Sequence, residues 1–165
     1  MTKKYLSQDE ALLKMQQYCA YQERCQDEVR SKLIELGVYR DVLENVIADL
    51  ISENFLNEER FAKAFAGGKF RIKHWGKIKI IQELKSKKIS EYCIRKALES
   101  EINEEDYKAT LLEVLNKKSN LLSESDKFKK NHKLALYAMG RGFEIELIWD
   151  CLNNFSSEWT FKTNR

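Results

Sequence analysis

The sequence predicts an all-α protein, organised as an elongated tandem array of three three-helix repeats. Proline is absent, glycine occurs only six times, and 33% of the 165 residues are charged. Such a composition favours helices over a β-sandwich, which would need more residues that form turns. Apolar residues recur at steps of three and four along most of the chain, as on one face of a helix. This cadence returns three times, which predicts the tandem arrangement.

The first repeat contains three predicted helices, over residues 8–22, 25–36 and 39–54. Each of these segments carries apolar side chains on one face. Gly37 follows the second segment, at the place where a helix end commonly needs a residue in the left-handed conformation.

The three repeats can be aligned on the residue pair that follows the second helix of each. These pairs are Gly37-Val38, Lys88-Ile89 and Gly142-Phe143, which lie 51 and 54 residues apart. Counted from the second residue of each pair, the positions nine before, five after and nine after are all apolar. The residues nine before are Val29, Ile80 and Leu134, those five after are Leu43, Ile94 and Ile148, and those nine after are Ile47, Leu98 and Leu152. The single chain is therefore divided into predicted repeats 8–55, 57–101 and 103–154, followed by a polar tail, 156–165.

The second repeat contains the most basic stretch of the chain, residues 69–88. It holds eight Lys or Arg and one acid, a net charge of +7, whereas the whole chain carries +3. The rest of the chain is therefore mildly acidic, at −4. Such a local concentration of positive charge creates a field that an anionic partner can find. A smaller basic cluster lies in the third repeat, at Lys127, Lys129, Lys130, Lys133 and Arg141.

The basic stretch begins inside a predicted helix that starts after Asn57, a good N-cap, and reaches Trp75. Its predicted apolar face is Phe61, Ala64, Phe65, Gly68, Ile72 and Trp75. Gly76 would end it, and a second helix would start near Lys77 and bury Ile78, Ile81 and Leu84. The alternative is a β-hairpin around Gly76, because apolar and basic residues also alternate between Phe70 and Ile80.

The chain carries little that points to catalysis. His74 and His132 lie far apart, and neither stands beside a candidate nucleophile. Gly67-Gly68-Lys69 lacks the earlier glycine and the Ser or Thr of a phosphate loop, and the four cysteines form no closely spaced pair. We therefore expect no enzymatic activity, no cofactor and no bound metal. No apolar run is long enough to span a membrane or direct export, so we expect a cytoplasmic protein.

An ordered set of residues in the second repeat is typical of a known family. The set is Asn57-Glu58-Glu59-Arg60-Phe61-Ala62, Phe65, Gly76, Ile80, Glu83-Leu84 and Lys87-Lys88-Ile89. Residues 33–38, and Arg141-Gly142-Phe143 with Leu147-Ile148, extend it over about residues 10–153. The chain thereby resembles the bacterial RecX proteins, which regulate the recombinase RecA. It departs from them at Cys25, where such proteins commonly have a capping serine.

The resemblance implies a non-catalytic regulator that binds RecA filaments on DNA and mainly inhibits recombinase activity in DNA repair, recombination and the SOS response. RecX-like proteins lie in the filament groove and restrain filament growth, ATP turnover and strand exchange. A monomer is expected, with single-stranded or duplex DNA as a further contact. The residues predicted to bind the partner or nucleic acid are Lys69, Arg71, Lys73, Lys77, Lys79, Lys85, Lys87, Lys88, Lys127, Lys130 and Arg141.

Two other functions are compatible with the same residues. Three-helix units can present a helix to the major groove, so the chain could be a stand-alone DNA-binding module of the helix-turn-helix type. It could also be a scaffold whose helices bind peptides or partner helices. Affinity for duplex DNA without RecA would favour the DNA-binding module. Absence of binding to both DNA and RecA would favour the scaffold.

Overall fold

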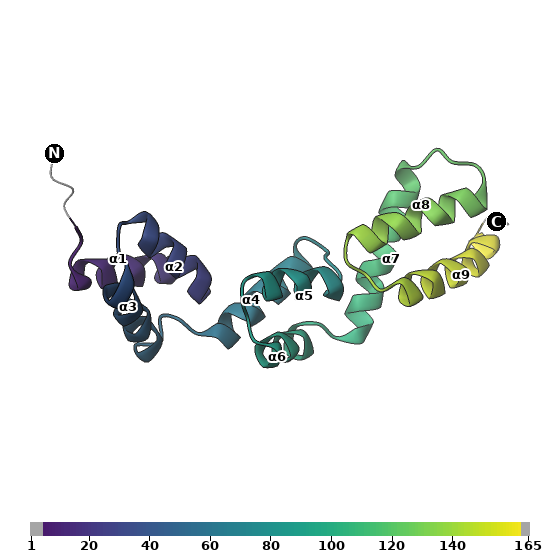
Figure 1. Ribbon diagram of the computed structural model, residues 1–165. Helices are drawn as coiled ribbons and strands as arrows, with labels where there is room; N and C mark the ends of the chain where they lie inside the picture. The colour runs from purple at the N-terminus through teal and green to yellow at the C-terminus, as the bar shows by residue number, and fades with distance from the viewer. Residues whose placement is uncertain (1–4, 163–165) are drawn as a thin grey trace. The chain divides into compact units, whose positions relative to one another are not determined.

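The computed structural model describes the backbone of residues 5–162 and the side chains of residues 5–154. In that part of the chain all regular structure is helical, with nine α-helices and no strand (Figure 1). The helices are α1 (Gln8–Tyr21), α2 (Gln26–Glu35), α3 (Arg40–Ser52), α4 (Glu58–Arg71), α5 (Lys77–Ser86), α6 (Glu91–Glu101), α7 (Glu104–Leu121), α8 (Lys127–Gly140) and α9 (Ile145–Lys162). The predicted all-α class is confirmed, and the alternative of a hairpin around Gly76 is wrong.

The chain divides into two compact units. Unit 1 comprises Met1–Phe65 and Leu84–Ala97, and unit 2 comprises Ala66–Glu83 and Leu98–Arg165. The three middle helices, α4, α5 and α6, each contribute residues to both units.

In unit 1, α1, α2 and α3 enclose a hydrophobic core. α3 packs against both α1 and α2 (Figure 1). Met15 of α1, Leu33 of α2 and Leu50 of α3 are each at most 1% exposed. The Ser7 hydroxyl oxygen accepts the backbone N–H of Glu10, and the Glu10 carboxylate accepts the N–H of Ser7. This reciprocal capping box fixes the start of α1.

In unit 2, α8 packs against both α7 and α9 (Figure 1). Tyr107 of α7, Leu134 of α8 and Ile148 of α9 are all buried. The Asp126 carboxylate accepts the backbone N–H of Lys129 at 2.9 Å, which caps the first turn of α8. α9 continues to Lys162, so the predicted polar tail starts inside a helix, but the tail's side chains lie outside the described residues.

The same turn ends the second helix of all three predicted repeats. Gly37, Lys88 and Gly142 adopt the left-handed conformation, with φ of +80°, +61° and +95°. The next residue in each case is buried, and its N–H donates to the carbonyl five positions earlier; these residues are Val38, Ile89 and Phe143. The left-handed residue reverses the chain, and the apolar residue after it closes the core. The repetition predicted from apolar spacing is thus also present in the backbone.

The helix predicted to reach Trp75 ends four residues earlier, at Arg71. His74 adopts a φ of +53°, and the N–H of Trp75 returns to the carbonyl of Lys69 at 3.1 Å. With the N–H of His74 bonded to the carbonyl of Phe70 at 3.1 Å, these features form a left-handed cap of the αL type. Ile72, predicted on the buried face, is therefore 77% exposed. The apolar residues continue at helical spacing through Ile72 and Trp75, although these residues lie beyond the end of the helix. The prediction was therefore wrong here.

The buried faces of α4 and α5 are also rotated from the predicted ones. Ala64 is exposed, whereas Ala62 and Ala66 are fully buried. In α5, Ile78 is 41% exposed and Ile80 is fully buried. Both helices carry small or apolar side chains on two adjacent faces, so periodicity alone could not choose between them.

Candidate functional site

Two lysines of the basic stretch lie over the ring of Trp75, in the turn between α4 and α5. The ring centroid is 4.8 Å from the Nζ of Lys69 and 4.4 Å from the Nζ of Lys79. The negative face of an aromatic ring attracts ammonium groups, and this attraction draws both lysines to Trp75. The half-buried ring thus gathers two positive charges from two different helices.

A close backbone crossing brings the α8–α9 turn to the α4–α5 turn. The N–H of Gly76 donates to the carbonyl of Arg141 at 2.8 Å, and the N–H of Ile78 donates to that of Gly142 at 3.0 Å. A Cβ added to Gly76 would overlap the backbone of Gly142, and one added to Gly142 would overlap Lys79. Only glycine allows two backbones to approach so closely.

Arg141 adds a further link across this crossing. Its guanidinium donates to the backbone carbonyl of Lys73. The ring of Trp75 joins Lys69 and Lys79, and the backbone of Lys73 joins Arg141 to the same turn. We call these five residues the Trp75 cluster. All five residues belong to unit 2. Within the described residues, no carboxylate forms an ion pair with Lys73, Lys79 or Arg141.

Tyr107 of α7 supports the crossing. Its hydroxyl oxygen accepts the backbone N–H of Lys77 at 2.9 Å, and its hydroxyl donates to the Glu144 carboxylate. The ring centroids of Phe70 and Phe143 lie 6.0 and 5.2 Å from that of Tyr107. Burial, and then the Glu144 carboxylate, raise the pKa of Tyr107 well above its usual range, so the phenol remains a donor. One side chain thus holds the starts of α5 and α9.

The other basic residues of the stretch from 69 to 88 lie opposite carboxylates. The pairs are Arg71–Glu101 (3.1 Å), Lys77–Glu104 (2.6 Å), Lys85–Glu91 (3.6 Å), Lys87–Glu28 (3.4 Å) and Lys88–Asp27 (2.9 Å). The first two belong to unit 2 and the last three to unit 1. A nearby carboxylate cancels much of the field of a basic group, so these five residues contribute less to attracting an anion than the charge count suggested.

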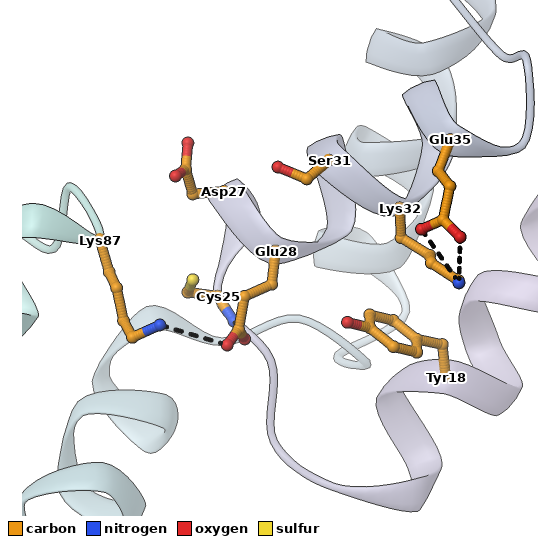
Figure 2. A pocket seen from close by; sticks show the side chains of 8 residues that line it. All are labelled: Tyr18, Cys25, Asp27, Glu28, Ser31, Lys32, Glu35 and Lys87. Atoms are coloured by element: carbon orange, nitrogen blue, oxygen red, sulfur yellow. Dashed lines mark hydrogen bonds and ion pairs between the residues drawn. The ribbon is translucent and has the colours of Figure 1, made fainter.

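Figure 2 shows the pair formed by Lys87, at the edge of a shallow pocket of about 250 Å³ in unit 1. The Lys87 ammonium reaches one oxygen of Glu28, and the other oxygen accepts the backbone N–H of Cys25 at 3.0 Å. Glu28 thereby satisfies an amide at the start of α2, and Lys87 balances its charge. The Glu28 side chain thus holds the start of α2, although Cys25 lacks the serine hydroxyl expected there.

Lys127 and Lys130 lie at the start of α8, about 20 Å along this helix from the Trp75 cluster. Phe128 and Lys129 stand between them in the sequence, and the Phe128 side chain is 81% exposed. In the part of the chain that the structure describes, the ammonium groups of Lys127, Lys129 and Lys130 have no carboxylate partner. We call Lys127, Phe128 and Lys129 the Phe128 surface, since Lys130, two positions after Phe128, projects from the opposite side of the helix.

Two family models match this chain. The model described as RecX, second three-helix domain, matches residues 57–98, and that described as RecX, third three-helix domain, matches residues 104–152. The two matches together span more than half of the sequence. The chain belongs to the RecX family.

Relatives of known name agree with this assignment. The chain is 33% identical over 133 residues to the regulatory protein RecX of Clostridium perfringens, covering 79% of this chain and 59% of that one. It is 30% identical over 133 residues to that of Thermotoga maritima, covering 81% and 76%. The crystal structure of RecX from Lactobacillus salivarius shares the fold, with a TM-score of 0.80 at 20% identity over 90% of this chain and 96% of that one. The chain thus spans about three fifths of the length of the clostridial relative.

The structure brings together only some of the residues predicted to bind a partner. Lys69 and Lys79 meet over Trp75, and Arg141, which comes from a different repeat, bonds to the backbone of Lys73 in the same turn. Periodicity placed Trp75 on a buried helical face, so its role in gathering lysines was missed. Phe128 was also missed, although a lone aromatic residue among lysines at a helix start is visible in the sequence.

The described residues contain no group of three His, Cys, Asp or Glu side chains that could hold a metal ion. The four cysteines are buried as free thiols. Burial raises the pKa of the Cys19 thiol to about 11, and it also raises the pKa values of Cys25 and Cys151. Within the same described residues, no helix combines the length and the apolar character that crossing a bilayer requires.

Proposed function

We propose that this RecX-family protein is a non-catalytic regulator that binds RecA filaments on DNA and mainly inhibits recombinase activity. Family membership and the name regulatory protein of its relatives support a regulatory role. The observation that carries the binding mode is the Trp75 cluster, because the ammonium groups of Lys69 and Lys79 converge on one ring and Arg141 of another repeat bonds to the same turn. Convergent cations suit the phosphates of DNA or an acidic surface of the filament.

The test adds the full chain to filaments preformed by RecA on single-stranded DNA. ATP turnover and mean filament length should both fall as the protein approaches stoichiometric amounts. If neither changes at equal concentrations of the two proteins, the proposed function is wrong. Binding to duplex DNA with unchanged filaments would instead favour a stand-alone DNA-binding module.

Two triple variants with the same change in charge test the role of the Trp75 cluster. Lys69→Glu, Lys73→Glu and Lys79→Glu should abolish most of the inhibition, because they reverse the converging charges. Lys85→Glu, Lys87→Glu and Lys88→Glu should retain most of it, because these lysines already face carboxylates. Circular dichroism of both variants would show that each remains folded. Equal losses in the two folded variants would mean that overall charge, and not the cluster, decides binding.

A further inference from the structure

The two basic surfaces of unit 2 present their aromatic rings in different ways. The ring of Trp75 is half-buried and lies under two ammonium groups. The ring of Phe128 is 81% exposed, and it makes no ring or cation contact within the described residues. The Phe128 ring is therefore accessible to a partner, and it stands on the first turn of α8, whose start is capped by Asp126.

The charges around Phe128 are placed to follow a chain of phosphates. Successive residues of an α-helix project about 100° apart, so Lys127 and Lys129 flank Phe128 on its two sides. His132 follows one turn later on nearly the same side and is exposed. The nearby Lys133, in contrast, is paired with Glu124 at 3.1 Å. An open ring between unpaired cations is the arrangement on which proteins stack the bases of single-stranded nucleic acid.

We propose that the Phe128 surface binds single-stranded nucleic acid, with one unpaired base stacked on Phe128 and the adjoining phosphates held by Lys127 and Lys129. This deepens the proposed function and rests on it, because it makes the DNA of the filament a direct contact of the protein. The ring of the Trp75 cluster is already covered by two ammonium groups, so this cluster would contact phosphates and no bases. In a duplex the bases are stacked on one another, so a ring on a helix surface cannot reach a base face.

The probes are two labelled oligonucleotides of equal length and charge, one of deoxythymidine and one with the same phosphodiester backbone but no bases. Fluorescence anisotropy at fixed salt should show that the full chain prefers the oligonucleotide with bases by roughly tenfold, near the lower end of what one stacked base contributes. Phe128→Leu keeps an apolar side chain and a good helix former, so it should remove this preference and keep the affinity for the abasic chain.

Lys129→Gln is the matched control. It should weaken binding to both oligonucleotides by a similar factor and leave the preference intact, because a phosphate contact carries no information about bases. An unchanged preference in Phe128→Leu, or no preference in the unaltered protein, would overturn the proposal. The proposal would also be overturned if Phe128→Leu no longer bound RecA filaments but bound both oligonucleotides normally, because the surface would then contact protein. Failure of the proposed function would be seen in a different experiment, in which the unaltered protein leaves the length and ATP turnover of RecA filaments unchanged.

Discussion

The two ends of the basic stretch differ in what the fold places opposite them. At its start, Lys69 and Lys79 converge on Trp75. At its end, Lys87 meets Glu28, and Lys88 reaches across to another carboxylate of α2. The two ends have similar composition, yet only the first concentrates positive charge. The electrostatic field of a basic segment therefore depends on the residues that the fold places beside it. Charge counted along the chain does not reveal those residues.

The largest expected effect is at the crossing that builds the Trp75 cluster. Gly142→Ala adds a Cβ that overlaps Lys79, at a residue whose φ is +95°. Strain at positive φ and steric overlap each cost on the order of 1–3 kcal/mol, so we expect a loss of roughly 3 kcal/mol in the free energy of unfolding. Urea denaturation followed by circular dichroism measures it. A loss below about 0.5 kcal/mol, the level of an ordinary surface substitution, would mean that the crossing does not hold unit 2 together.

Gly68→Ala is the control for that experiment. Gly68 lies inside α4, and a Cβ added there would meet nothing within 4 Å. Alanine is favoured over glycine in a helix interior, so this change should raise the free energy of unfolding by about 1 kcal/mol. The two substitutions add the same methyl group with opposite expected signs.

Tyr107→Phe should lower the free energy of unfolding by about 2 kcal/mol, because it leaves the N–H of Lys77 and the carboxylate of Glu144 without their shared partner. The raised pKa of Tyr107 adds a pH signature. The folded protein keeps the phenol proton above pH 10, where the unfolded chain loses it, so the contribution of Tyr107 is complete below about pH 10 and declines above it. The stability difference between the two proteins should therefore shrink from pH 9 to pH 11. A constant difference would contradict the assignment of the phenol as the donor to Glu144.

The helical class and the threefold repeat could be predicted because they depend on local signals. Apolar spacing marked the helices, and the pairs that begin with Gly37, Lys88 and Gly142 marked equivalent turns. The Trp75 cluster could not be predicted, because it depends on a backbone crossing between turns about 66 residues apart. No periodicity within one segment reports which distant segment will face it. The same holds for Glu28, whose contact with Lys87 joins different repeats.

At the other end of the stretch, Lys87→Glu should destabilise unit 1. It replaces an attraction with a repulsion beside Glu28, and both partners are only about one quarter exposed. We expect the free energy of unfolding to fall by about 1 kcal/mol. The Cys25 thiol lines the same pocket, and its burial raises its pKa, so opening of the destabilised unit should make its alkylation faster. Mass spectrometry of the labelled peptides measures the rate at Cys25.

Lys85→Glu is the matched control for Lys87→Glu. The side chains of Lys85 and Glu91 are 56% and 87% exposed, so the same change of charge should alter stability by less than about 0.5 kcal/mol. If Lys85→Glu and Lys87→Glu accelerate labelling of Cys25 equally, the contact between Lys87 and Glu28 would have no structural role of its own.

The smallest effect concerns Lys88, which occupies the left-handed position that glycine fills in the equivalent turns at Gly37 and Gly142. Lys88→Gly relieves a strain of about 1 kcal/mol and loses an exposed pair with Asp27 that contributes only a few tenths. The melting temperature should therefore rise slightly, whereas Gly37→Lys, the reverse change, should lower it. A Cβ added at Gly37 would meet nothing within 4 Å, so that loss mainly reports the cost of the left-handed conformation. A fall in the melting temperature of Lys88→Gly would show that the contact with Asp27 outweighs backbone strain, and that the paired end of the stretch stabilises unit 1 more strongly than its exposure implies.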